Sequence, residues 1–73
     1  MNRLPRLSGR DAIKAFGRLA TKLIQRGSHV VLRHKESPFR RLVVPDHKEL
    51  ATGTLRALIR EAGLTAAEFQ ALL

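Results

Sequence analysis

The apolar residues of this 73-residue chain change their spacing twice along the sequence. Between residues 9 and 19 they recur three and four positions apart, which predicts a helix with one buried face. Residues 22–44 instead hold three short runs of aliphatic and β-branched residues, the composition typical of strands. Residues 53–62 return to the helical spacing. This order restricts the chain to an α+β fold, because each apolar face must be buried against another element.

Capping residues indicate where the helices begin and end. Ser8 can accept a hydrogen bond from an amide of the first turn, and Asp11 lies near the positive end of the helix dipole. Thr65 and Glu68 have the spacing of a capping box and predict a short terminal helix. Gly63 supplies the left-handed conformation that closes the helix before it. We expect the terminal helix to bury Phe69, Leu72 and Leu73.

Turn residues separate the three predicted strands, which we place at residues 22–25, 29–34 and 40–44. Gly27 lies in the turn between the first two strands, and Pro45 ends the third. Because the connections are short, we predict an antiparallel three-stranded meander. The helices should share one face of this sheet, which leaves the other face to solvent or to a ligand.

The chain is strongly basic, with 14 Lys and Arg residues against 6 Asp and Glu and a formal charge of +8. Residues 1–41 hold eleven of the basic residues and two of the acidic ones. This balance predicts a polyanionic partner. A basic membrane-surface peptide would place its charges along one amphipathic helix, whereas here they continue through the predicted strands.

Length and cysteine content narrow the class of protein further. Residues 1–73 suffice for a single small domain, and no cysteine is present. A disulfide scaffold, a thiolate zinc site and a thiol nucleophile are therefore excluded. No run of eighteen apolar residues occurs, so we expect a cytoplasmic protein without membrane association.

His29 is the main candidate for acid–base chemistry. It begins a predicted strand directly after Gly27 and Ser28, with Arg26 before the turn and Arg33 further along the strand. An imidazole can take or give a proton near neutral pH, and nearby cations can stabilise the phosphorane charge of RNA cleavage. Strand alternation puts His29 and Arg33 on one face. The alternative is an ordinary surface histidine in a turn.

The other two histidines raise the question of a metal site. His34 follows His29 by five residues and His47 follows His34 by thirteen, which is outside the usual short-range ligand spacings. Alternation also sets His34 on the opposite face from His29. We therefore predict no metal and no cofactor, and interpret His34 as a strand-end surface residue. His47 is either a loop-structuring residue or a contact of a substrate or partner.

Basic and polar side chains of the middle of the chain predict a cationic surface. Its expected members are Lys22, Gln25, Arg26, Arg33, Arg40, Arg41 and Lys48. Such residues bind phosphates without reading sequence, although an ordinary solvated face remains the alternative. Phe16 and Phe69 fall on core-facing positions, which argues against a single-strand reader built on exposed rings. Phe39 could stack on a base or cover the edge of the core.

Several short motifs occur together in a characteristic order. They are Gly27-Ser28-His29, Val44-Pro45-Asp46-His47, Gly53-Thr54-Leu55 and Glu61-Ala62-Gly63-Leu64, within a span from Ser8 to Phe69. In order and rough spacing the chain resembles the HicA family of toxin ribonucleases. The resemblance implies a fold like that of the double-stranded-RNA-binding domain, cleavage of messenger RNA, and neutralisation by a cognate HicB-type antitoxin.

The resemblance and the residues together define an expected site. We expect His29 to act as the catalytic acid–base residue, without metal, and the RNA 2′-hydroxyl to act as nucleophile, because no cysteine, paired carboxylate or histidine cluster is available. The expected RNA-binding residues are Lys22, Gln25, Arg26, Gly27, Ser28, Arg33 and Lys48. We expect the free protein to be a monomer.

The chain departs from the family pattern at two places. It has Leu19-Ala20-Thr21 where members usually carry a glycine followed by an aromatic residue, and Ile24 where an arginine is common. These departures keep a non-catalytic RNA-binding module, or a decayed toxin, open as an alternative. A basic protein-interaction module is the third class that the sequence allows.

Overall fold

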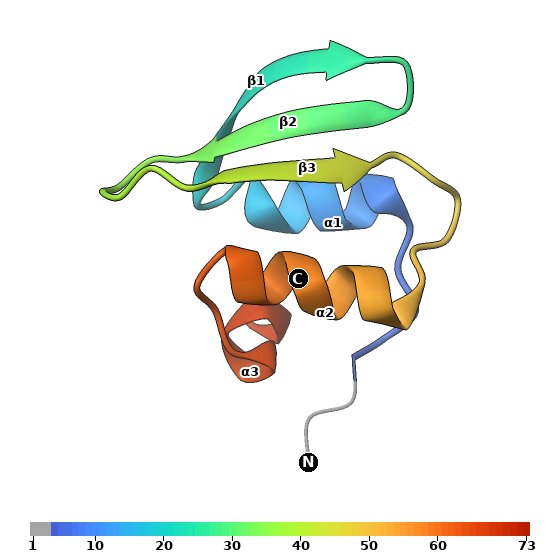
Figure 1. Cartoon of the computed structure of the whole chain (residues 1–73). Coiled ribbons are helices and arrows are strands. Elements are labelled where there is room, and N and C mark those ends of the chain that lie inside the picture. The colour runs from blue at the N-terminus through green and yellow to red at the C-terminus, as the bar shows by residue number, and fades with distance from the viewer. Residues whose placement is uncertain (1–3) are drawn as a thin grey trace.

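Three antiparallel strands form one sheet in chain order, and the helices cover only one of its faces (Figure 1). The structure is a computed structural model that describes residues 4–73, so residues 1–3 of the predicted domain lie outside the described residues. Its elements are α1 (Gly9–Phe16), β1 (Ala20–Arg26), β2 (His29–His34), β3 (Arg41–Pro45), α2 (Thr52–Glu61) and α3 (Ala66–Gln70). The predicted α+β fold, like that of the double-stranded-RNA-binding domain, is confirmed.

The core lies between the sheet and helices α1 and α2. Alternate residues of β2 and β3 point into it and are at most 4% exposed: Val30, Leu32, Leu42 and Val44. The rings of Phe16 from α1 and Phe69 from α3 meet with their centroids 4.9 Å apart and tilted by 43°. Figure 1 shows α3 beside α2, on the side away from the sheet. The terminal helix therefore closes the core on the side of α2 that lies away from the sheet.

Helix α1 begins where the sequence predicts and ends three residues earlier than the predicted Leu19. Ser8 Oγ accepts the Asp11 amide at 3.0 Å and Asp11 Oδ2 accepts the Ser8 amide at 3.4 Å, which completes a capping box. The predicted end is wrong because the amides of Arg18 and Leu19 donate to carbonyls only three residues back, tightening the chain into a turn. The Leu19 carbonyl then accepts from the Lys35 amide, at the edge of the sheet.

Strand β1 is longer than predicted and contains a β-bulge. Ala20 is 5% exposed and pairs with His34, so the strand starts two residues before the predicted Lys22. The pairing register shifts between Lys22 and Ile24, which leaves Leu23 as an extra residue without a partner on β2. The bulge decides which β1 side chains share a face with His29.

The residues predicted to end α2 and to begin α3 are confirmed. Gly63 follows α2 with a φ of +76°, and α2 lies within one residue of the predicted range 53–62. Thr65 Oγ1 accepts the Glu68 amide at 3.1 Å, and the Glu68 side chain accepts the Thr65 amide at 2.9 Å. A capping box thus starts α3 as the sequence indicates.

Burial at the end of the chain differs from the prediction at one residue. Phe69 is fully buried at 0% exposed, and Leu72 packs against the core while partly exposed. Leu73, predicted to be buried, is 50% exposed. The prediction is wrong there because α3 ends at Gln70 and the residues after it form a turn, which breaks the helical spacing.

Candidate nucleic-acid interface

Cross-strand pairing identifies the side chains on the sheet face that no helix covers. Residues directly opposite each other in an antiparallel ladder share a face. Because the buried residues of β2 and β3 mark the helix-covered face, the residues between them mark the other, which we call the open face. Its three rows are Arg26, His29 and Pro45; Ile24, Val31 and Val43; and Thr21, Arg33 and Arg41.

A two-residue turn positions His29 at one end of the open face. Arg26 and His29 pair across the turn, and Gly27 has a φ of +56° at its first central position, as in type II′ hairpin turns. A Cβ at Gly27 would meet nothing within 4 Å, so the backbone there is accessible to a ligand. His29 itself is exposed, while the next residue, Val30, turns into the core. The imidazole thus stands beside an arginine and an open turn.

The start of α1 and the loop after β3 come together beside this turn. The Asp46 amide donates to the Ser28 carbonyl, and the Gly9 amide donates to the His47 carbonyl at 2.7 Å. A Cβ at Gly9 would meet the Pro45 carbonyl oxygen and would lie 2.7 Å from the His47 amide nitrogen. Only glycine allows this approach, which brings the first turn of α1 against the loop.

A hollow of about 350 Å³ opens where the loop meets α1. Its lining residues are Ser8, Arg10, Asp46, His47 and Lys48. Lys48 is a predicted RNA-binding residue, and Arg10, which the sequence did not predict, lines the same hollow. No local sequence signal indicates this placement of Arg10, because it depends on the close approach of Gly9 to the loop after β3.

Two arginines face each other across the far row of the open face. Arg33 lies four residues along β2 from His29, roughly 13 Å away at the rise of a strand, and pairs with Arg41 of β3. The Arg33 guanidinium also lies 4.8 Å from the centroid of the Phe39 ring. Like charges placed directly opposite each other repel, so this pair favours binding of an anion.

No carboxylate of residues 4–73 lies within ion-pair distance of the open-face arginines. Within the described residues, an ion pair joins Arg6 to Glu49 at 3.6 Å, and neither residue belongs to the open face. The charges of Arg26, Arg33 and Arg41 are consequently not neutralised within the described chain. The arginines at the two ends of the open face can therefore attract phosphates.

Lys22 and Gln25 lie on the opposite side of β1 from His29. The bulge at Leu23 turns Lys22 to that side, and regular alternation next to Arg26 places Gln25 there. Lys22 pairs with Leu32 and Gln25 pairs with Val30, both of which are buried on the helix-covered side. The two side chains are exposed at the edge of that side, where Lys22 Nζ donates to Gln25 Oε1 at 2.8 Å. The structure therefore brings Arg26, Gly27 and Ser28 beside His29 and Arg33 onto the same face, places Lys48 in the hollow next to α1, and leaves Lys22 and Gln25 on the other face.

Arg40 also lies away from the open face. Its guanidinium Nη1 donates to the Glu61 carbonyl at 3.4 Å, at the end of α2. A cation there complements the helix dipole and an unpaired terminal carbonyl. Strand β3 begins at Arg41, one residue later than predicted, because Arg40 turns toward the helix.

His34 has a local structural role. Its Nδ1 accepts the Glu36 amide at 3.1 Å and supports the start of the connection to β3. Within residues 4–73, no three His, Asp or Glu side chains gather as a metal-binding group. His47 is exposed in the hollow beside Arg10 and Lys48, and its carbonyl holds the start of α1.

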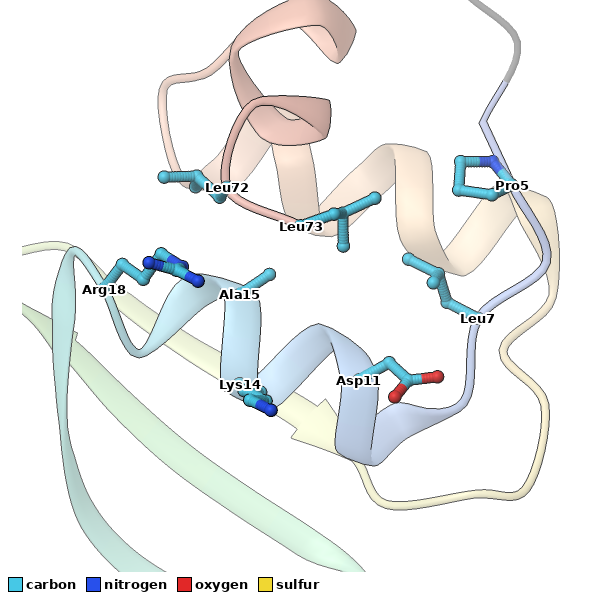
Figure 2. A pocket seen from close by; sticks show the side chains of 8 residues that line it. All are labelled: Pro5, Leu7, Asp11, Lys14, Ala15, Arg18, Leu72 and Leu73. Carbon is cyan, nitrogen blue, oxygen red and sulfur yellow. The ribbon is translucent and has the colours of Figure 1, made fainter.

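A further hollow lies against α1 and contains none of the predicted site residues. It measures about 420 Å³ and is bounded by α1 and by both ends of the described chain. Figure 2 shows Leu7, Leu72 and Leu73 gathered beside Ala15 of α1, with Arg18 at one end. This hollow is therefore separate from the open face, which carries the arginines and the exposed histidine.

Fold and site together define a class of protein: a small α+β domain whose sheet presents an exposed histidine among arginines that form no ion pair within residues 4–73. The model of a protein family described as the HicA toxin of bacterial toxin–antitoxin systems matches residues 9–64. Because this match covers most of the chain, the protein belongs to the HicA toxin family. It is thus a toxin of a toxin–antitoxin system, a class that implies an antitoxin partner.

A search of curated proteins finds no match to this chain. Across residues 4–73, no helix has the length and apolar character needed to cross a bilayer.

Proposed function

We propose that this protein is an endoribonuclease that cleaves messenger RNA in the cytoplasm and is neutralised by a HicB-type antitoxin. Membership of the HicA toxin family supports the toxin class. The observation that supports nuclease activity is the exposure of His29 on the open face, beside Arg26 and the accessible Gly27 turn. An acid–base group next to a phosphate-binding cation is the minimum that RNA cleavage by its own 2′-hydroxyl requires.

In the proposed mechanism His29 is the acid–base residue and needs no metal. The imidazole takes the proton of the 2′-hydroxyl, or gives one to the leaving 5′-oxygen, and solvent water exchanges the other proton while the 2′-oxygen attacks phosphorus. The P–O5′ bond breaks and a cyclic phosphate forms. Arg26, directly opposite His29, stabilises the charge that develops on the phosphorane oxygens. The amides around Gly27 and Ser28 are placed to bind one of those oxygens.

Binding of the RNA backbone is proposed to use cations at both ends of the open face. Lys48 and Arg10, in the hollow beside the His29 end, contact phosphates on one side of the scissile bond. Arg33 contacts phosphates on the other side. Lys22 and Gln25 are proposed to contact RNA only where it passes over the edge of β1. Phosphate contacts of this kind give affinity but no base preference.

Cleavage assays on long RNA test the mechanism directly. We expect RNA to be cut in the presence of a chelator, DNA to remain intact, and the products to carry cyclic phosphate ends. His29→Ala should reduce the rate by about a hundred- to ten-thousand-fold, the contribution of a positioned acid–base group. His34→Ala is the matched control, because His34 makes its contact within the β2–β3 connection and faces away from His29.

Two results would count against this assignment. One is undiminished cleavage by His29→Ala protein that folds as the parent does, judged by circular dichroism and thermal melting. The other is cleavage that depends on added magnesium. In either case the open face would keep only its proposed role in RNA binding, and cleavage would not be assigned to His29.

One observation favours a non-catalytic RNA-binding module as the second candidate. Within residues 4–73, His29 makes no side-chain hydrogen bond, whereas an acid–base histidine is usually oriented by a partner at its other nitrogen. The module would bind RNA through Arg26 and Arg33 and leave it intact. The same assay separates the two, because the second candidate predicts equal RNA affinity and no fragments for the parent protein and His29→Ala.

A further inference from the structure

The open face exposes apolar side chains as well as arginines. Ile24, Val31 and Val43 form its middle row, directly opposite one another across all three strands. Ile24 is 43% exposed and Val43 is 49% exposed, and Val31 between them is partly exposed. The bulge residue Leu23 and the loop residue Phe39 line a shallow hollow together at the Arg33 end. We call these residues the apolar patch: Leu23, Ile24, Val31, Phe39 and Val43.

This gathering is not an ordinary scatter of surface residues. Residues 4–73 contain five exposed large hydrophobic side chains, and four of them belong to the apolar patch. The core does not include them, because β2 and β3 already bury an apolar row on their opposite face against the helices. An apolar area of this kind, surrounded by polar residues, is typical of a protein-binding surface.

RNA does not account for the middle row. Phosphates are bound by cations and amides, and bases stack on aromatic rings or on arginine planes. Ile24, Val31 and Val43 are aliphatic and offer none of these contacts. Their burial by RNA would leave the backbone phosphates over apolar surface, which is unfavourable.

The surroundings of the middle row indicate the chemistry of what covers it. Arg26 and His29 flank it on one side, and Arg33 and Arg41 flank it on the other. The nine residues of the three rows include no carboxylate. A second copy of this chain is a poor occupant, because face-to-face packing would set these arginines against one another. A complementary partner carries an apolar ridge with acidic residues on both sides.

We propose that the open face is the docking surface of an acidic protein, and that Ile24, Val31 and Val43 provide the binding affinity while the arginines steer association. The proposal rests on the antitoxin assignment made above and specifies its contact. It also divides the open face in two: RNA uses the two flanking rows, and the antitoxin uses the middle row as well. A partner bound to the middle row would cover His29 and exclude RNA.

Binding and cleavage measured on the same variants test this division. The double variant Ile24→Thr and Val43→Thr keeps the β-branched shape and the charge, and the new hydroxyls are solvated in the free protein. Leu73→Thr is the matched control, because Leu73 is 50% exposed but lies beside α1 and not on the sheet. The probe is the acidic protein encoded by the neighbouring gene, titrated against each purified variant, with RNA cleavage and RNA affinity measured in parallel.

We expect the double variant to bind the probe at least about 30-fold more weakly than the parent chain, the scale of losing interface hot-spot residues. The Leu73→Thr control should bind as the parent does, and all three proteins should bind and cleave RNA equally. Unchanged probe binding by the double variant would overturn the docking surface and leave the antitoxin assignment standing. A parallel loss of RNA affinity would also overturn it, because the middle row would then belong to the RNA site.

Two other outcomes are equally informative. If the neighbouring protein does not bind the parent chain, the antitoxin assignment fails, and the docking proposal fails with it. If sedimentation shows that the parent chain dimerises and the double variant does not, the open face is covered by a second copy, and the acidic partner is excluded as its occupant.

Discussion

The two faces of the sheet are built from the same strands and differ in almost every property. Val44 is 0% exposed and Val43, its neighbour on β3, is 49% exposed. The helix-covered face of β2 and β3 buries aliphatic residues, whereas the open face mixes aliphatic residues with arginines that have no acidic partner in the described chain. Folding free energy therefore comes mainly from the covered face. The open face is free to carry a composition that suits binding instead.

The open face even opposes folding to a small extent. Arg33 and Arg41 repel each other across β2 and β3, and the middle row is only partly buried in the free protein. A surface of this kind becomes favourable when a polyanion or an acidic protein covers it. The difference between the faces thus separates residues whose substitution lowers stability from residues whose substitution lowers binding.

The largest stability effect is expected where α1 docks onto the covered side. Gly9→Ala would push a methyl group into the Pro45–His47 backbone, and neither segment can move without losing the hydrogen bond between the Gly9 amide and the His47 carbonyl. We expect a loss of about 3 kcal/mol in the free energy of unfolding, the upper end of the range for overpacking. At about 4–8 °C per kcal/mol for a domain of this size, thermal melting would register it clearly.

Gly53→Ala is the control for this substitution. A Cβ at Gly53 would meet nothing within 4 Å, and the residue lies in α2. The substitution should raise stability by about 0.5–1 kcal/mol through helix propensity. Equal melting temperatures for the two variants would contradict the close approach of α1 to the loop.

A smaller effect should distinguish the faces at two adjacent valines. Val44→Ala removes buried methyl groups and leaves a cavity, which should lower the free energy of unfolding by about 2 kcal/mol. Val43→Ala should cost less than about 1 kcal/mol, chiefly through strand propensity. Since both variants lose the same propensity on the same strand, the difference between their denaturant midpoints measures burial alone. A difference near zero would mean that the two faces contribute equally to stability.

Much of the fold could be predicted because its signals are local. The Ser8 cap, the box formed by Thr65 and Glu68, and the left-handed Gly63 each act within a few residues, and each is confirmed. The predicted end of α1 at Leu19 is wrong for a reason that spacing cannot reveal. The Leu19 carbonyl pairs with the distant Lys35 amide, and this tertiary contact overrides the helical pattern.

The candidate site was less accessible to sequence reasoning. Alternation correctly set Arg33 on the face of His29, because β2 is regular. Lys22 was expected on the same cationic surface, but the bulge at Leu23 turns it to the other side, and neither glycine nor proline marks that bulge in the sequence. The proposed role of Arg10 was not predictable, because its position beside Lys48 depends on packing between α1 and the loop after β3. In a regular strand the sequence pattern predicts which face a side chain occupies, whereas a bulge or a contact between distant segments cannot be predicted in this way.

The smallest expected effect on stability comes from removing one positive charge from either side of the molecule. Arg33→Gln and Arg56→Gln each remove one positive charge, the first from the open face and the second from the exposed side of α2. Both should change the free energy of unfolding by less than about 0.5 kcal/mol, as is usual for surface substitutions. Loss of the Phe39 contact in Arg33→Gln is offset by relief of its repulsion with Arg41.

RNA affinity measured over a range of salt concentrations should nevertheless separate these two variants. Each phosphate contact that is lost lowers the slope of log K against log salt by about 0.7–1. We expect that decrease for Arg33→Gln and an unchanged slope for Arg56→Gln. Because net charge falls equally in both, any general weakening of attraction to a polyanion cancels between them. A difference in slope therefore reports where the RNA lies, and equal slopes would place it away from the open face.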